Sequence, residues 1–156
     1  MQYPIPIREA MPSDRERLYP LLASAHLSTD AVLVEGTRYW LAEDSDRQVV
    51  GIVGLEYGAQ AVLLRSAVVS PALRGQGIAA ALVELALESA ASAGYSCAYL
   101  FSTGAGPYWI RRGFYEVPVP ELVAALPAAP QVLRFEAMGW LPTEVAWRKD
   151  LSQGKR

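Results

Sequence analysis

Apolar stretches in the first half of the chain predict three neighbouring β-strands. The segments Arg38–Glu43, Val49–Glu56 and Ala61–Val69 are rich in β-branched, leucine and aromatic residues, which is typical of half-buried or buried strands. Turn-forming residues separate them, at Asp44–Asp46 and around Gly58. Because both connections are short, we expect the three strands to pair as an antiparallel meander.

A different periodicity follows the third strand. From Gly77 onward the apolar residues recur at helical spacing, while Glu84 and Glu88 fall on the opposite face; the apolar positions are Ile78, Leu82, Leu85 and Ala86. This pattern predicts an amphipathic helix. Gly94 is suited to end it, since glycine adopts the left-handed conformation common at helix C-termini.

The remaining segments predict strands and helices on both sides of this core. An N-terminal strand with two prolines suits a sheet edge, and Ser13 with Glu16 has the spacing of a capping box. In chain order we expect a strand at Tyr3–Arg8, a helix from Ser13 to Ala25, a strand at Cys97–Phe101, a helix at Pro107–Arg112, a strand at Gly113–Val117, a helix at Glu121–Leu126 and a strand at Thr143–Lys149. Together these elements predict an α/β protein with a mixed sheet.

Length and composition indicate one globular domain spanning residues 1–156. Of the 156 residues, 52% are hydrophobic and 19% are charged, which suits a compact core. The net charge of −2 comes from 14 basic and 16 acidic residues spread along the chain. This balance lacks the basic patch of a nucleic-acid-binding protein, so we expect no nucleic-acid partner.

The sequence also favours a cytoplasmic location. With one cysteine, Cys97, and one histidine, His26, neither a disulfide framework nor a metal cluster is expected. Met1–Ala10 lacks the apolar core of a signal peptide. The long apolar segment Ile78–Gly94 carries two glutamates and is shorter than the ~20 residues of a membrane span. We therefore predict no metal and no membrane partner.

The segment Val69–Ala79 joins the third strand to the long helix and has the features of an anion site. Gly75 and Gly77 allow the backbone to turn so that successive N–H groups point into one concavity, at the positive end of the helix dipole. Arg74 supplies a cation for a charge-assisted contact with a phosphate. A strand, a proline, an arginine, Gly-x-Gly and a helix in this order predict a pyrophosphate ligand.

This segment resembles the coenzyme A motif of the GNAT acetyltransferases, and Arg112-Gly113-Phe114 resembles a second marker of that family. The resemblance covers nearly the whole chain. It implies a mostly antiparallel central sheet of six to seven strands, flanked by helices and splayed at the coenzyme site, with acetyl-CoA as co-substrate. Homodimers are common in the family, so the resemblance implies a possible homodimer. The residues that it implies for coenzyme binding are Ala67, Val68, Val69, Arg74, Gly75, Gln76, Gly77, Ile78 and Ala79.

A dinucleotide site is the competing interpretation, because Gly75-x-Gly77-x-x-Ala80 also fits a loose nucleotide-binding pattern. Such a site requires an acidic residue after the next strand to bind a ribose hydroxyl. Cys97–Phe101 is followed by Ser102 and Thr103 instead. The coenzyme A interpretation is therefore preferred.

Acetyl transfer to an amine requires a base, a polarised thioester carbonyl and a proton source for the thiolate. Glu56, at the end of a meander strand, is the candidate base, and an ordinary solvated carboxylate is the alternative. The resemblance implies that the N–H near Ala67 or Val68 polarises the carbonyl. The tyrosine that usually serves as the general acid in this family is replaced by Trp109. The neighbouring Tyr108, or a water, is then the candidate acid, with core packing as the alternative.

The segments Phe101–Thr103, Tyr108–Phe114 and Glu116–Val119 resemble the catalytic domain of N-acetylglutamate synthases and the small acetyltransferases associated with arsenic resistance, both of which lack the usual tyrosine. Leu64-Arg65-Ser66 also resembles the second group. This implies an N-acetyltransferase that acts by direct transfer on a small-molecule amine, such as an amino acid or an amino-acid-like compound. Arg65 and Ser66 are the candidate acceptor-binding residues, since Arg65 suits a carboxylate. Two alternatives stay open: a non-catalytic acyl-CoA-binding sensor or interaction module, and a protein N-acetyltransferase.

Overall fold

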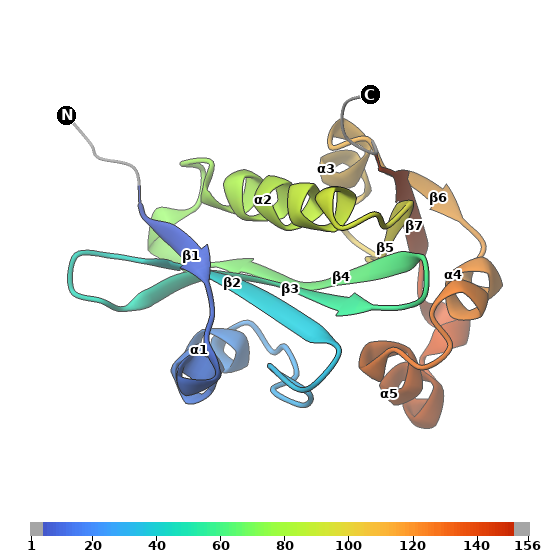
Figure 1. Ribbon diagram of the computed structural model, residues 1–156, viewed down its shortest axis with the longest axis horizontal. Coiled ribbons are helices and arrows are strands. Elements are labelled where there is room, and N and C mark those ends of the chain that lie inside the picture. The colour runs from blue at the N-terminus through green and yellow to red at the C-terminus, as the bar shows by residue number, and fades with distance from the viewer. Residues whose placement is uncertain (1–4, 152–156) are drawn as a thin grey trace. The chain divides into compact units, whose positions relative to one another are not determined.

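The meander forms the first part of the sheet in the computed structural model, which describes residues 5–151 (Figure 1). Its strands are β2 (Thr37–Glu43), β3 (Val49–Tyr57) and β4 (Ala61–Val69). At the first turn the Asp44 N–H donates to the Gln48 carbonyl (3.0 Å), and at the second the Gly58 N–H donates to the Ala61 carbonyl (2.8 Å). The three predicted strands are confirmed.

Four further strands complete a seven-stranded mixed sheet in the order β1-β2-β3-β4-β5-β7-β6. They are β1 (Ile7–Glu9), β5 (Cys97–Phe101), β6 (Tyr115–Val117) and β7 (Ala146–Asp150). The sheet is mostly antiparallel, with β4 and β5 parallel. Their register joins Ala61–Leu63 to Cys97–Tyr99, although both strands continue beyond these residues. The predicted fold class is confirmed, and the parallel pairing ends at Leu63 and Tyr99.

The N-terminal predictions hold in part. Residues 1–4 lie outside the described range, and the strand observed at Ile7–Glu9 pairs with β2 at the sheet edge. Helix α1 (Arg15–Ser24) begins after Asp14, so the prediction of a capping box at Ser13 was wrong. The Asp14 carboxylate instead accepts a hydrogen bond from the Met11 N–H (2.7 Å), and this bond fixes the turn that precedes the helix.

The long helix and the second half of the chain follow the predicted order, with one addition. The helices are α2 (Ile78–Ser92), α3 (Gly106–Arg111), α4 (Val119–Ala125) and α5 (Pro130–Met138). Helix α5 was not predicted, because the prolines around it weakened the periodic signal. Pro130 occupies its first turn and Gly139 ends it at φ +73°, which are ordinary start and stop signals. None of the helices within residues 5–151 is both long and apolar enough to cross a bilayer.

The described chain divides into two compact units. The first contains the residues up to Leu55 and Ser66–Ala86. Neighbouring residues of β3 point to opposite faces there: Ile52 packs in the core beneath α1, and Gly51 faces Leu82 of α2. Within this unit α1 and α2 therefore cover opposite faces of the sheet, as the ribbon shows (Figure 1).

The second unit contains Glu56–Arg65 and the residues from Leu87 onward. Its core lies between the sheet and helices α4 and α5; the buried members are Ala61, Leu63, Cys97, Tyr99, Val117, Leu122, Leu126, Ala129, Val132 and Ala146. On the other face of β7, a Cβ at Gly106 of α3 would lie 3.2 Å from the Trp147 ring. The organisation of residues 1–156 as a single domain stays a prediction.

Candidate functional site

Strand β4 changes its geometry at Ser66. This residue has φ +60°, which is uncommon for a non-glycine residue and typical of a bulge that bends a strand. The residues before it are buried, whereas Ala67 is exposed and Val68 and Val69 are buried again. The bend therefore presents the backbone around Ala67 at the surface, close to the end of the strand.

The loop after β4 turns at two glycines. Gly75 and Gly77 both have φ +83°, and a Cβ at either position would meet no atom within 4 Å. Glycine is thus required here for backbone conformation, with open space beside it. Helix α2 begins directly afterwards at Ile78, and its first N–H groups have no partner within the helix. This arrangement has the backbone conformation that the sequence analysis expected of an anion site at a helix N-terminus.

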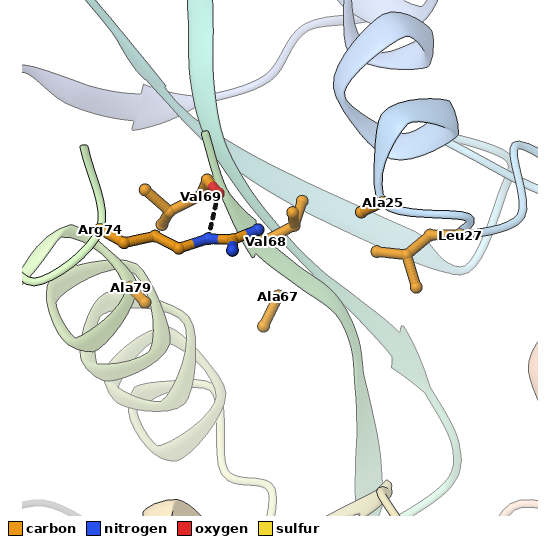
Figure 2. Close-up of a pocket in the computed structure, with 7 residues that line it drawn as sticks. All are labelled: Ala25, Leu27, Ala67, Val68, Val69, Arg74 and Ala79. Atoms are coloured by element: carbon orange, nitrogen blue, oxygen red, sulfur yellow. Dashed lines mark hydrogen bonds between the residues drawn. The ribbon is translucent and has the colours of Figure 1, made fainter. Parts of the chain in front are cut away.

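A pocket of about 400 Å³ lies next to this loop, within the first unit. Five of the nine predicted coenzyme residues line it, as Figure 2 shows: Ala67, Val68, Val69, Arg74 and Ala79. The walls are small and apolar, and the guanidinium of Arg74 supplies the positive charge. Its Nε donates to the Val69 carbonyl (3.2 Å), so the side chain extends from the loop across the end of β4.

The other four predicted coenzyme residues surround this lining. Gly75, Gln76 and Gly77 are exposed on the loop, and Ile78 is buried beneath the first turn of α2. The exposed residues are therefore placed to offer backbone groups to an anion, whereas Ile78 anchors the helix in the core.

Two residues of the pocket were missed by the sequence analysis. Ala25 and Leu27 follow α1 and line the side opposite Arg74 (Figure 2). Two bonds from Arg15 hold the loop that continues from them: its Nε donates to the Val32 carbonyl (2.9 Å) and its Nη2 to the Leu33 carbonyl (2.8 Å). No local sequence signal marks Ala25 or Leu27, because folding brings them beside β4.

The predicted base and the predicted acceptor-binding arginine are bound to each other in the second unit. Arg65 Nη1 donates to Glu56 Oε2 (2.8 Å), and the Gln131 N–H at the start of α5 donates to Glu56 Oε1 (2.9 Å). The side chains are 4% and 0% exposed, respectively. If Glu56 accepted a proton, the buried guanidinium would lose its counter-charge. This geometry therefore favours a structural role for the pair.

Tyr108 and Trp109 take different positions on α3. Trp109 is buried and packs edge-to-face on Phe114, with ring centroids 5.4 Å apart. The Tyr108 ring packs against Trp109 and beneath the Arg112 guanidinium, at 4.9 Å in each case. Its hydroxyl oxygen is buried and has no hydrogen-bond partner among residues 5–151. A buried hydroxyl is stabilised by a hydrogen-bond partner, so the Tyr108 hydroxyl is a candidate donor to a ligand or a water.

Structural comparison finds the same fold in acetyltransferases of several bacteria. An acetyltransferase of the GNAT family from Staphylococcus aureus Mu50 matches with a TM-score of 0.75 and 18% identity, over 96% of this chain and 100% of the other. A Mycobacterium tuberculosis protein in complex with CoA matches with a TM-score of 0.74 and 20% identity, over 94% and 99% of the two chains.

N-acetylglutamate synthase from Neisseria gonorrhoeae, in complex with coenzyme A and N-acetylglutamate, also matches. The TM-score is 0.73 and the identity 20%; the match covers 97% of this chain and 36% of the synthase. At such identities the likeness establishes the fold. No curated protein is similar enough in sequence to count as a relative.

The sequence itself matches a family description. The model of the acetyltransferase (GNAT) domain matches residues 35–116, just over half of the chain. The matched range contains β2, β3, β4, the glycine loop and α2, which together build the pocket and the anion site apart from Ala25 and Leu27. The protein therefore belongs to the GNAT acetyltransferase family.

Proposed function

We propose that this protein transfers an acetyl group from acetyl-CoA directly to the amine of a small molecule. The observation that carries the proposal is the pocket between the end of β4 and the start of α2, beside Gly75 and Gly77. Its apolar walls suit an alkyl chain, and the orphan N–H groups of α2 with Arg74 suit a pyrophosphate. The residues present thus fit coenzyme A.

Different residues of the chain are proposed to bind the coenzyme and to transfer a proton. Ala67, exposed after the bulge, offers backbone groups that can pair with an extended ligand as an added strand would. Acetyl-CoA, when bound, supplies an activated thioester. Tyr108 is the proposed proton donor, because its hydroxyl is buried without a partner among the described residues. We assign the Glu56–Arg65 pair to supporting β4 from below the bulge.

The proposal is tested first by coenzyme binding. Gly77→Asp places a carboxylate where a phosphate would bind, while Asp tolerates the left-handed conformation and caps helices well. The matched control is Gly94→Asp, because Gly94 has φ +98° and lies just beyond the opposite end of α2, where an added Cβ would meet no atom within 4 Å. By calorimetry we expect CoA to bind the wild type and the control, and to fail with Gly77→Asp.

Turnover is then measured as thiol release from acetyl-CoA with a panel of amines. Acceptor-dependent release that Gly77→Asp abolishes and Gly94→Asp retains would support an N-acetyltransferase. No CoA binding by the wild type would overturn the proposal.

A second function is favoured by one observation. The position of the family's usual tyrosine holds Trp109, which is buried in the core, so the protein is also a candidate acyl-CoA-binding sensor. CoA binding without thiol release for any amine or peptide acceptor would support the sensor. Release with an amino-terminal peptide alone would support a protein acetyltransferase.

A further inference from the structure

Glu144 differs from four other carboxylates that the structure describes. Arginine side chains lower the pKa of Glu9, Asp14, Glu43 and Glu121. Burial instead raises the pKa of Glu144, with no opposing hydrogen bond or charge. Its carboxylate has no ion-pair or hydrogen-bond partner within residues 5–151. A desolvated carboxylate without a partner is unfavourable in the free protein.

The backbone places this carboxylate on a defined face of the sheet. Glu144 is extended (φ −86°, ψ 163°) and leads into β7, where Ala146 pairs with Phe101. The Ser102 N–H donates to the Val145 carbonyl (2.9 Å), which continues the pairing by one residue. Because residues i and i+2 of an extended chain share a face, Glu144 lies on the face of Ala146 and Phe101.

That face also carries an aromatic cluster, which we define as Phe101, Phe135 and Trp140. The Phe101 and Phe135 ring centroids are 5.0 Å apart, and those of Phe135 and Trp140 are 5.5 Å apart. Trp140 is 39% exposed although its ring is held by Phe135 and by Arg134, whose guanidinium lies 5.8 Å from the ring centroid. A positioned and exposed aromatic ring on the same face as a carboxylate without a described partner suits an organic ammonium ion.

The cluster also lies beyond the part of β5 that pairs with β4. Phe101 ends β5, two residues beyond Tyr99, the last residue of β5 in register with β4. No β4 residue pairs with Phe101 in that register. The aromatic cluster thus lies at the end of β5, beyond the residues that pair with β4.

We propose that Glu144 binds the ammonium group of the acceptor and that the aromatic cluster binds its apolar body. This inference rests on the proposed N-acetyltransferase function and names its substrate class: a primary amine with an aromatic or apolar body and no carboxylate beside the amine. A carboxylate beside the acceptor's amine would be repelled by the Glu144 carboxylate. Arg65, the predicted partner for such a group, is already held by Glu56.

Three acceptors with matched bodies test the substrate class in the wild-type protein. Phenethylamine and phenylalanine differ by one carboxylate, and butylamine lacks the ring. We expect kcat/KM for phenethylamine to exceed that for phenylalanine by about tenfold or more, the loss expected when a charged contact is opposed. A preference for phenylalanine or glutamate would overturn the inference.

Two glutamine variants test Glu144 itself. Glu144→Gln should raise the KM for phenethylamine by about tenfold to a hundredfold, with the KM for acetyl-CoA unchanged. Glu136→Gln is the matched control, because Glu136 is an exposed carboxylate on α5, and it should change neither KM. Equal kinetics for the two variants would overturn the inference.

A stability measurement separates binding from a structural role. Since burial disfavours the charged form of Glu144, removing the charge should leave the urea midpoint at pH 7 unchanged or higher. A lower midpoint would show that Glu144 stabilises the fold and would count against a binding role.

Calorimetry without acetyl-CoA distinguishes this inference from the proposed function. Phenethylamine binding that requires Glu144 supports the inference even if CoA does not bind and the proposed function fails. CoA binding without any phenethylamine binding leaves the proposed function standing and overturns the inference.

Discussion

Replacing Arg65 by methionine should destabilise the protein strongly, because the change leaves a buried carboxylate without its counter-charge. The Arg65 and Glu56 side chains are 4% and 0% exposed, and 2.8 Å separates Nη1 from Oε2. Breaking one side of such a pair costs about 3–5 kcal/mol. For a chain of this size, each kcal/mol lowers Tm by roughly 2–4 °C. We therefore expect a large loss in both urea and thermal unfolding.

A matched ion pair at the surface tests whether burial causes the loss of stability expected for Arg65→Met. Arg38 and Glu9 form an even closer ion pair, 2.6 Å from Nη2 to Oε1, but their side chains are 42% and 45% exposed. Arg38→Met should cost about 0–1 kcal/mol, as exposed pairs do. The same urea unfolding assay at pH 7, followed by circular dichroism, measures both variants.

A second substitution removes the uncompensated charge. Glu56→Gln in the Arg65→Met background keeps an oxygen that can accept the Gln131 N–H, which donates to Glu56 at 2.9 Å. We expect this double variant to recover about 2 kcal/mol or more relative to Arg65→Met alone. If Arg65→Met costs no more than Arg38→Met, or if the double variant recovers nothing, the assignment of the pair to structure is refuted.

Three further predictions concern other residues. The Arg8 guanidinium beside Asp14 holds the pKa of that carboxyl below its usual value. The ionised carboxylate therefore stabilises the fold at neutral pH, and this stabilisation is lost as the pH falls below about 3.9. Asp14→Asn should lower the urea midpoint at pH 7 and reduce the difference between the urea midpoints at pH 7 and pH 3. Gly54→Ala should cost about 1–3 kcal/mol in the same assay, because its Cβ would overlap the buried Tyr39 ring; an unchanged midpoint would contradict this. Tyr108→Phe should lower kcat and alter its pH dependence with little effect on the KM for acetyl-CoA, and unchanged turnover would exclude the tyrosine as proton donor.

The sheet order and helix α5 show where prediction from the sequence stopped. Runs of β-branched and apolar residues located the three strands of the meander, and helical periodicity located α2, because these patterns depend on neighbouring residues. They did not place β7 between β5 and β6, which depends on pairing between residues far apart in the chain. Helix α5 was missed although Pro130 and Gly139 mark its ends, since the surrounding prolines masked its period.

In the candidate site, too, local features were predicted from the sequence and long-range contacts were not. Gly75, Gly77 and the start of α2 were predicted as an anion site, and the structure shows both glycines at φ +83° beside the pocket. Glu56 and Arg65 were assigned separate roles, because nothing local indicates that they bind each other. Glu144 was not considered, since its burial and its missing partner are visible only in the folded chain.

The sequence by itself determined the strand, glycine loop and helix that form the predicted coenzyme motif. Backbone conformation, helix polarity and amphipathic spacing are properties of a few neighbouring residues and survive as a pattern. The tertiary structure decided which side chains meet: Gln131 reaches Glu56 across 75 positions, and Ala25 and Leu27 complete a pocket begun by β4. Such contacts depend on packing and chain closure over long separations, which no local pattern encodes.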